Sequence, residues 1–298
     1  MNFDQLNRLH GSRVKAIFGF APASLAELLF CVLPELERRR TERLLNRQGR
    51  KRRYVANDGY PREVTPLEKV LMTLIYLRHN VRHEVVGAMF GYSADTSENA
   101  FAEVVPLLRD LFPATKWEAE KKWRRGEPSW TPDQVDLVIV DSFETPVRRP
   151  SVQERQKRIY SGKKKRHPLK TQVATDQDGE ILTINSGHRG PKADLKLYEE
   201  AGLPDPLADK PCLGDKAYQS SNHPEMTTPH KKPKGEELTE EQLLKNKQLA
   251  AKRVHVEHGI RRLKAFRILR DEYRLATGLF PMIASAVVGL VQMTRIIP

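Results

Sequence analysis

Three acidic side chains, Asp141, Asp215 and Glu257, are the residues of this chain best suited to chemistry. Asp141 ends an apolar run that begins at Val135, and Asp215 follows the short apolar segment 211–214. Glu257 lies in a segment whose spacing predicts a helix. Carboxylates from two strand ends and one helix can converge even when they are far apart in the sequence. Three such ligands could hold two divalent cations about 3.5–4 Å apart, which stabilises both the attacking and the leaving oxygen of a phosphodiester.

The predicted helix around Glu257 also carries cations. Arg253 lies four residues before Glu257 and Lys264 seven residues after it, so all three share one helical face. An ion pair between Arg253 and Glu257 would explain those two residues alone. A face that combines one acid with Arg253, Arg261 and Lys264 is better suited to a metal on one side and DNA phosphates on the other.

The spacing of the histidines and cysteines does not predict a second metal site. His255 and His258 are three residues apart, but no cluster of further ligands accompanies them, so we expect them to face solvent or DNA. The only cysteines are Cys31 and Cys212, and two distant cysteines give neither a disulfide framework nor a thiolate zinc site. This usage fits a reducing compartment, and no secretory signal opens the sequence.

The composition predicts a globular protein that binds polyanions. Of the 298 residues 39% are hydrophobic and 30% charged, and the net charge is +13. The basic excess is concentrated in the ranges 35–53 and 148–170, and clusters that flank candidate catalytic acids favour phosphate binding over a solvated face. The most apolar stretch, 279–291, is too short for a membrane span and contains Pro281. We therefore expect a buried core helix and no membrane contact.

Residues 1–60 are expected to form a helical N-terminal segment with a basic arm. A helical run with Ser24 as its N-cap precedes the charged, helix-like segment 35–47. The basic string 48–53 that follows is typical of a turn or an arm. These first 60 residues are also our candidate for a dimer interface, on the basis of the amphipathic run 25–36.

Residues 61–112 have the spacing of apolar residues and turns that is typical of a helix-turn-helix domain. Thr65 is a candidate cap with Pro66 at the first helical position. The pattern predicts helices over 66–78 and 83–90, the turn 91–93, and a third helix from a cap at Asp95 or Thr96 to Leu108.

The third helix of this domain would present Ser97, Glu98, Asn99 and Glu103 on its exposed face. Ser97 and Asn99 are the candidates for DNA contact. A purely structural three-helix bundle fits the spacing equally well, and the basic charge balance favours DNA binding.

Residues 113–134 have the composition of a linker, and 135–298 form a second domain. The pattern predicts strands over 135–140, 169–176, 180–186 and 212–214, with a hairpin turn at 176–179, and helices over 194–201, 236–264 and 280–296. Strands followed by a crossover helix, another strand and a flanking helix predict an α/β domain with a mixed sheet.

Two segments of this second domain, 141–150 and 160–172, resemble bacterial insertion-sequence transposases of the DDE superfamily, in the subgroup with an N-terminal helix-turn-helix. The same family has a segment like 213–218 around its second acid, and segments like 254–264 and 266–269 around its third. The resemblance covers about 61–290, nearly the whole chain.

The resemblance implies a ribonuclease-H-like catalytic domain with a mixed sheet and flanking helices, preceded by an all-α helix-turn-helix domain. It also implies that Asp141, Asp215 and Glu257 are both the catalytic residues and the ligands of two Mg²⁺ ions, for which Mn²⁺ can substitute. Further residues are expected to contact DNA: Arg253, Lys264, Arg261, Lys163, Lys164, Lys165, Arg166, Ser97 and Asn99.

The chain departs from the family pattern at three places. Ser142-Phe143 follows the first acid where the family usually has Gly-Thr, and Ala193 precedes Asp194 where the family usually has His. Ala250 stands three residues before Arg253, where a tyrosine is common. None of the three acids is lost, so we expect activity.

The function implied is that of a DNA transposase, which binds the inverted-repeat ends of its element as a homodimer and cleaves and transfers strands into target DNA. Such an enzyme would work in the bacterial cytoplasm in association with the nucleoid. One alternative is a domesticated or decayed copy that acts as a non-catalytic repressor or scaffold. A structure-specific nuclease is weaker, because it leaves the N-terminal domain unexplained.

Overall fold

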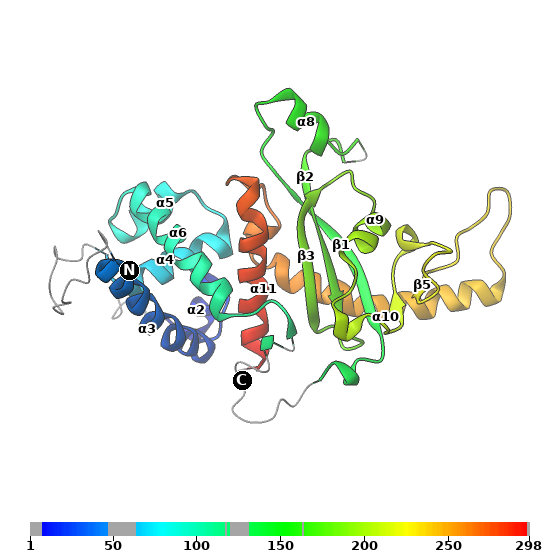
Figure 1. The fold of residues 1–298 in the computed structure, drawn as a ribbon, viewed down its shortest axis with the longest axis horizontal. Helices are drawn as coiled ribbons and strands as arrows, with labels where there is room; N and C mark the ends of the chain where they lie inside the picture. Colours follow the sequence, from blue (N-terminus) through cyan, green and yellow to red (C-terminus); the bar gives the residue numbers. More distant parts are fainter. Residues whose placement is uncertain (1–7, 47–63, 117, 120–130, 163, 297–298) are drawn as a thin grey trace.

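The computed structural model describes residues 8–46, 64–116, 118–119, 131–162 and 164–296. A group of helices and a five-stranded sheet lie on opposite sides of one long apolar helix, α11 (Phe280–Ile296) (Figure 1). The predicted basic string 48–53 and much of the predicted linker 113–134 lie outside the described residues.

The helical part contains α2 (Gly11–Phe18), α3 (Pro22–Asn46), α4 (Pro66–His79), α5 (His83–Phe90) and α6 (Ala94–Leu111). Helix α4 begins where its sequence predicts. The Thr65 hydroxyl accepts a hydrogen bond from the Glu68 N–H, and the Glu68 carboxylate accepts one from the Thr65 N–H, so two backbone donors of the first turn are satisfied. Ser93 caps α6 by accepting from the Thr96 N–H, two residues earlier than the first cap we predicted.

Helix α3 differs from the prediction in its start and in its role. It begins at Pro22, so Ser24 lies inside the first turn and is not an N-cap, and it continues through Pro34. Proline suits the first helical position because its missing N–H would have no partner there. The apolar face that includes Leu28 and Val32 is buried within the helical part. The apolar face on which we based the dimer-interface prediction is therefore part of the core of the helical part, whereas Phe30 on the other side of the helix is exposed.

The sheet contains β1 (Val138–Pro146), β2 (Pro168–Thr175), β3 (Ile181–Arg189), β4 (Cys212–Leu213) and β5 (Met226–Thr227). Its order is β3-β2-β1-β4-β5. The first three strands form an antiparallel meander, and β4 and β5 continue parallel to β1. This is a mixed sheet of the ribonuclease-H-like kind, which confirms the predicted fold class. The two-residue strand β5 was not predicted.

Strand β1 is longer than predicted, which changes the setting of Asp141. It pairs with β2 along its whole length, from Ile139 opposite Thr175 to Pro146 opposite Pro168. Asp141 therefore lies inside a strand and not at its end, contrary to the prediction. The strand that ends here is β4, whose last paired residue, Leu213, lies opposite Ile139.

Helices cover both faces of the sheet. They are α9 (Asp194–Ala201), α10 (Glu240–Lys264) and α11, whereas α8 (Gln153–Ile159) lies beyond the end of the strands (Figure 1). The 3-10 turns are η2 (Pro132–Gln134), η3 (Asp205–Leu207), η4 (Lys216–Tyr218), η5 (Arg267–Leu269) and η6 (Thr277–Leu279). Because side chains alternate along a strand, Ile139 and Phe143 enter the core shared with α10 and α11. Val138 and Val140 enter a second core that contains Tyr198 of α9. The sheet is thus a layer between α10 and α11 on one side and α9 on the other.

The window Thr277–Thr294 is long and apolar enough to cross a membrane by length and composition, and 61% of it is buried. The apolar stretch is therefore not too short for a membrane span, contrary to the prediction, whereas the expected core helix is confirmed by its burial. Helix α11 packs against both α6 and β3, and Ala284, Val288 and Met293 are fully buried.

The contact between α11 and α6 leads to a stability prediction. A Cβ atom added at Gly289 would lie 1.9 Å from the Phe112 carbonyl oxygen, which follows α6. We expect Gly289→Ala to lower the free energy of unfolding by about 1–3 kcal/mol or more, because overpacked backbone must shift. Urea unfolding of this variant should be compared with Gly278→Ala, where the added methyl group meets no atom within 4 Å. Equal stability of the two variants would contradict this packing.

Candidate active site beside the end of β4

The parallel pairing of β1 with β4 brings Asp141 and Asp215 together. Ile139 pairs with Leu213, and each aspartate follows two residues later on its own segment. Side chains two residues apart on a strand share a face, so Asp141 lies on the α10 side, as Ile139 does. Asp215 caps η4, where its carboxylate accepts a 2.8 Å hydrogen bond from the Ala217 N–H.

Asp141 is held at both of its carboxylate oxygens. Oδ1 accepts a 2.7 Å hydrogen bond from the Ser142 N–H, and Oδ2 accepts a 3.1 Å hydrogen bond from Arg253 Nη2 on α10. The side chains of Asp141 and Arg253 are each only 19% exposed. Because β4 stops pairing at Leu213, the adjacent edge of β1 is open at the level of Asp141.

Burial raises the pKa of Asp141, and the neighbouring Asp215 raises this pKa further. The hydrogen bond from the Ser142 N–H and the charge of Arg253 act in the opposite direction. A carboxylate whose ionisation is disfavoured by burial and by a second carboxylate is a ligand that a divalent cation stabilises. The pair therefore fits a metal ion.

Lys264, at the end of α10, lies within electrostatic reach of Asp141. Its ammonium group lies 5.1 Å from the centre of the Phe143 ring. Burial lowers the pKa of Lys264, the charge of Asp141 raises it, and Lys164 and Arg166 lower it. Lys264 is thus within electrostatic reach of both the first acid and the basic loop that follows β1.

Glu257 is the predicted acid that the structure leaves apart. It is exposed on α10, and within the described ranges no three His, Cys, Asp or Glu side chains are gathered as a metal site. Arg253 and Lys264, which share its helical face, both approach Asp141. By helical spacing Glu257 lies on nearly the same side of α10 as these two cations. Arg261 is exposed farther round the same helix.

The basic loop that contains Lys164, Lys165 and Arg166 has a hairpin-like form. A bridge between Ser161 and Arg166 closes it, with a 2.8 Å hydrogen bond from the Ser161 N–H to the Arg166 carbonyl. Lys164, Lys165 and Arg166 are exposed, while Lys163 lies outside the described residues.

The helix-turn-helix arrangement of α4, α5 and α6 is present, but the exposed face of α6 is smaller than predicted. Ser97 is buried, 1% exposed, and hydrogen-bonded at 2.9 Å to His83 Nδ1, so the exposure predicted for it is wrong. Glu98 and Asn99 are exposed as expected. The prediction for Ser97 failed because the register that we assigned to the third helix exposed a side of its first turn that is buried in the structure.

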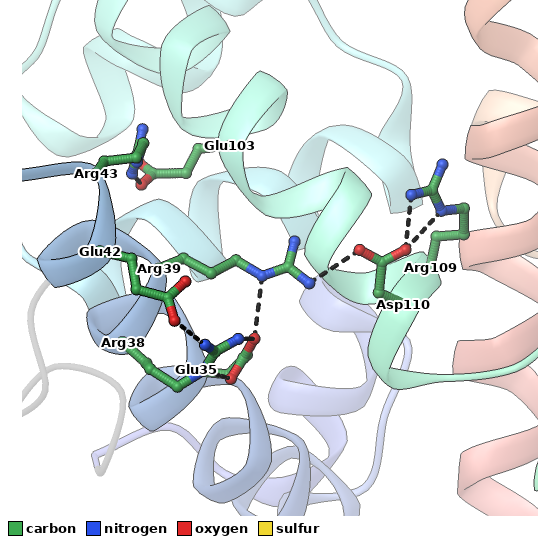
Figure 2. A network of polar contacts seen from close by, with 8 residues as sticks. All are labelled: Glu35, Arg38, Arg39, Glu42, Arg43, Glu103, Arg109 and Asp110. Carbon is green, nitrogen blue, oxygen red and sulfur yellow. Dashed lines mark hydrogen bonds and ion pairs between the residues drawn. The ribbon is translucent and has the colours of Figure 1, made fainter. Parts of the chain in front are cut away.

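Glu103 was also expected on the exposed face, and this is wrong because α3 covers it. Figure 2 shows side chains of α3 reaching towards α6. Arg43 pairs with Glu103, whose side chain is 15% exposed, and Arg39 pairs with Asp110 at 2.9 Å. Lys69 of α4 adds a 2.7 Å ion pair to Glu103. The flank of α6 towards α3 is therefore closed, and Asn99 lies on the part that remains open.

His83 makes the stability of the helical part dependent on pH. Burial lowers the pKa of this ring from 6.5 to about 4, and the ring stacks on Tyr76 at 4.0 Å between centroids. Between these two pH values the unfolded chain takes up a proton that the folded chain does not, so stability falls as pH drops from 6.5 towards 4. Urea unfolding at several pH values should show this loss, and His83→Asn should reduce it. An unchanged pH dependence in the variant would contradict the assignment.

Several side chains near Asp141 were not recognised from the sequence. Ser142 Oγ lies 2.5 Å from Asp194 Oδ1, and Lys170 Nζ lies 3.1 Å from the same oxygen. The alternation of β1 offered a signal, because a polar residue next to Asp141 must face the opposite side of the sheet. The partners on β2 and α9 could not be read from spacing.

The fold and the paired acids together define a ribonuclease-H-like domain joined to a helix-turn-helix domain. The family model of the DDE superfamily endonuclease matches residues 140–292, and that of the helix-turn-helix of DDE superfamily endonuclease matches residues 62–114. The chain belongs to the DDE superfamily of insertion-sequence transposases with an N-terminal helix-turn-helix.

Two relatives are similar over most of their length. The probable transposase for insertion sequence element IS702 of Microchaete diplosiphon is 33% identical over 227 residues, which are 75% of this chain and 78% of that protein. A candidate transposase for insertion sequence element IS112 of Streptomyces albus G is 24% identical over 212 residues, 69% of this chain and 72% of the relative. No solved structure matches the chain.

Membership of this family carries general properties. It implies a nuclease-type enzyme, and both the helix-turn-helix and the transposase family imply binding to DNA. Proteins of the DDE superfamily generally use divalent metal ions.

Proposed function

We propose that this chain is an active transposase that binds the inverted-repeat ends of its insertion sequence and catalyses strand cleavage and strand transfer. The observation that carries the proposal is the position of Asp141 beside Asp215 where β4 ends, facing Arg253 on α10. With no acid of the predicted set lost, a decayed copy that only binds DNA is the less favoured alternative.

Asp141, Asp215 and Glu257 are the residues that would hold Mg²⁺, or Mn²⁺ in its place. Bound metal would neutralise the phosphodiester charge and stabilise the attacking and leaving oxygens. The protein need supply no nucleophile, because a positioned water and then the freed 3′-hydroxyl can attack, so positioning and charge account for the rate. Arg253 orients Asp141, and the side chains of both residues are largely buried.

Cations around the site would hold DNA. Lys264 is within electrostatic reach of Asp141 and of Lys164 and Arg166 in the exposed basic loop. Their contacts with backbone phosphates would be independent of sequence, whereas the open part of α6 with Asn99 is the candidate for base contact. Two chains are needed to act on two ends, so we infer a homodimer on DNA, working at the nucleoid in the bacterial cytoplasm.

A groove between α8, the end of β3 and α9 would extend this DNA surface. Its lining includes Arg158, Arg189, Lys192 and Lys196. Lys192 is paired with Glu200. In the part of the chain that the structure describes, the other three cations form neither a hydrogen bond nor an ion pair through their side chains. These cations would be available for phosphates.

The groove leads to a prediction about salt dependence. Arg189→Ala together with Lys196→Ala should weaken duplex binding and reduce the slope of log K against log salt by about 0.9 for each phosphate that is no longer neutralised. Fluorescence anisotropy at several salt concentrations measures this slope. Lys210→Ala, before β4 and away from the groove, is the matched control. A double variant with the slope of the wild type would exclude the groove from the DNA interface.

The proposed function is tested by substrate selectivity. The purified protein is given labelled duplexes with and without the terminal repeat of its own element, in Mg²⁺. We expect nicking at the repeat boundary and little cleavage of the arbitrary duplex. Equal cleavage of both would favour a structure-specific nuclease and contradict the proposal.

A further inference from the structure

We propose that Ser142, Asp194 and Lys170 form a positioning cluster that fixes the carboxylate of Asp141 from the opposite face of the sheet. The inference rests on the proposed function, because it assigns these residues to the same reaction. The three side chains come from β1, from the first turn of α9 and from β2.

The charge of Lys170 anchors the cluster. This lysine is 7% exposed, and its ammonium group lies 3.1 Å from Asp194 and donates a 2.6 Å hydrogen bond to the Lys192 carbonyl. A buried ammonium group is costly without a charged partner, so Asp194 has one strongly preferred place. Asp194 also lies at the N-terminal end of α9, where a negative charge is favourable.

Ser142 connects this anchor to the site. Its hydroxyl lies 2.5 Å from Asp194 Oδ1 on the α9 side, and its N–H donates to Asp141 Oδ1 at 2.7 Å. The residue is thus held through its side chain while its backbone orients the neighbouring acid. The hydroxyl is the most direct link between α9 and the backbone that carries Asp141.

The sheet restrains this part of β1 from one side only. Asp141 and Ser142 pair with Val173 and Gln172 of β2, but beyond Leu213 no residue of β4 pairs with β1 on the other side. The cluster supplies a restraint where the ladder stops. A residue without a side-chain hydroxyl at position 142 could not make this contact with Asp194.

The expected consequence is a preorganised Asp141. Groups that orient a metal ligand typically contribute about 10–100-fold to metal affinity or activity. We therefore expect Ser142→Ala to weaken Mn²⁺ binding and to slow cleavage by about 10–100-fold each, and Ser142→Thr, which keeps the hydroxyl, to restore both.

The test measures Mn²⁺ binding to the DNA-free protein by titration calorimetry, with thermal melting to verify folding. Ser142→Ala, Ser142→Thr and the double variant Ser142→Ala/Asp194→Asn are compared with the wild type. We expect the alanine variant to melt near the wild type and bind Mn²⁺ more weakly, and the added Asp194 change to weaken binding little further, because the link is already broken. Asp194→Asn can disturb folding because it removes the charged partner of Lys170. The comparison of the two Ser142 single variants with the wild type therefore decides whether the cluster positions Asp141.

The outcomes separate the two proposals. A wild type that binds no Mn²⁺ and cuts no DNA would contradict the proposed function and this inference with it. A wild type that binds Mn²⁺ and cuts, with Ser142→Ala equal to it in both, would overturn only the positioning cluster. If all variants are folded and Ser142→Thr weakens Mn²⁺ binding as much as Ser142→Ala does, the hydroxyl has no positioning role.

Discussion

Asp141→Asn is expected to abolish cleavage while leaving end binding nearly intact. The substitution keeps the shape of the side chain and removes the charge that a divalent cation needs. A loss of about 4 kcal/mol of transition-state stabilisation corresponds to about 10³-fold in rate. Stability should change little, because burial and Asp215 already disfavour the ionised form of Asp141. Single-turnover cleavage of a terminal-repeat duplex measures the effect.

The matched control for this substitution is Asp136→Asn. Asp136 is exposed just before β1 and lies outside the site. We expect it to cleave at the rate of the wild type. Cleavage by Asp141→Asn within a few fold of this control would remove Asp141 from the catalytic set.

Glu257→Gln is expected to have an effect of similar size for a different structural reason. Glu257 is exposed, and the described part of the chain gives its side chain no hydrogen bond or ion pair. The thermal midpoint should therefore stay that of the wild type while cleavage falls by about 10³-fold. Such a separation of activity from stability is expected of a residue that serves the reaction and not the fold.

His258→Ala is the control on the same helix. His258 is the next residue along α10 and is also exposed. We expect it to retain cleavage in Mg²⁺ and in Mn²⁺. If His258→Ala loses activity and Glu257→Gln does not, the third ligand is assigned to the wrong residue.

Helix boundaries were predictable where capping chemistry marks them. Thr65 with Pro66 located the start of α4, and the apolar pattern located α11 from Phe280 to Ile296. The start of α3 was missed because Ser24 is a good cap by residue type, whereas Pro22 begins the helix and Ser24 is buried. The capping preference of serine could not show that α3 packs against α4 and α6 and that Ser24 is buried within its first turn.

The site was predictable as residue types and less so as geometry. The approach of Asp215 to Asp141 follows from two parallel strands, although the strand that ends beside Asp141 is β4 and not β1. The position of Glu257 could be predicted only to a helix face, because contacts between α10 and the sheet depend on crossing geometry. Ser97 shows the same limit, since a shift of one position on α6 turns a side chain from solvent to core.

The contacts around Ser142 could not be derived from sequence spacing at all. Lys170, Asp194 and Ser142 come from three elements, and only the folded sheet shows that they meet. Alternation along β1 does predict that Ser142 faces away from Asp141. What it meets there depends on how α9 crosses the sheet.

Metal-dependent cleavage of the element's ends by the carboxylates beside β4 and on α10 can be tested in one assay. The most direct measurement is strand nicking of a labelled terminal-repeat duplex by the wild type in Mg²⁺, Mn²⁺ or EDTA, with Glu257→Ala alongside. We predict nicks at the repeat boundary that require the metal and disappear in the variant. Tight binding of the same duplex with no nick in either metal would contradict metal-dependent cleavage and identify a copy that binds DNA without cleaving it.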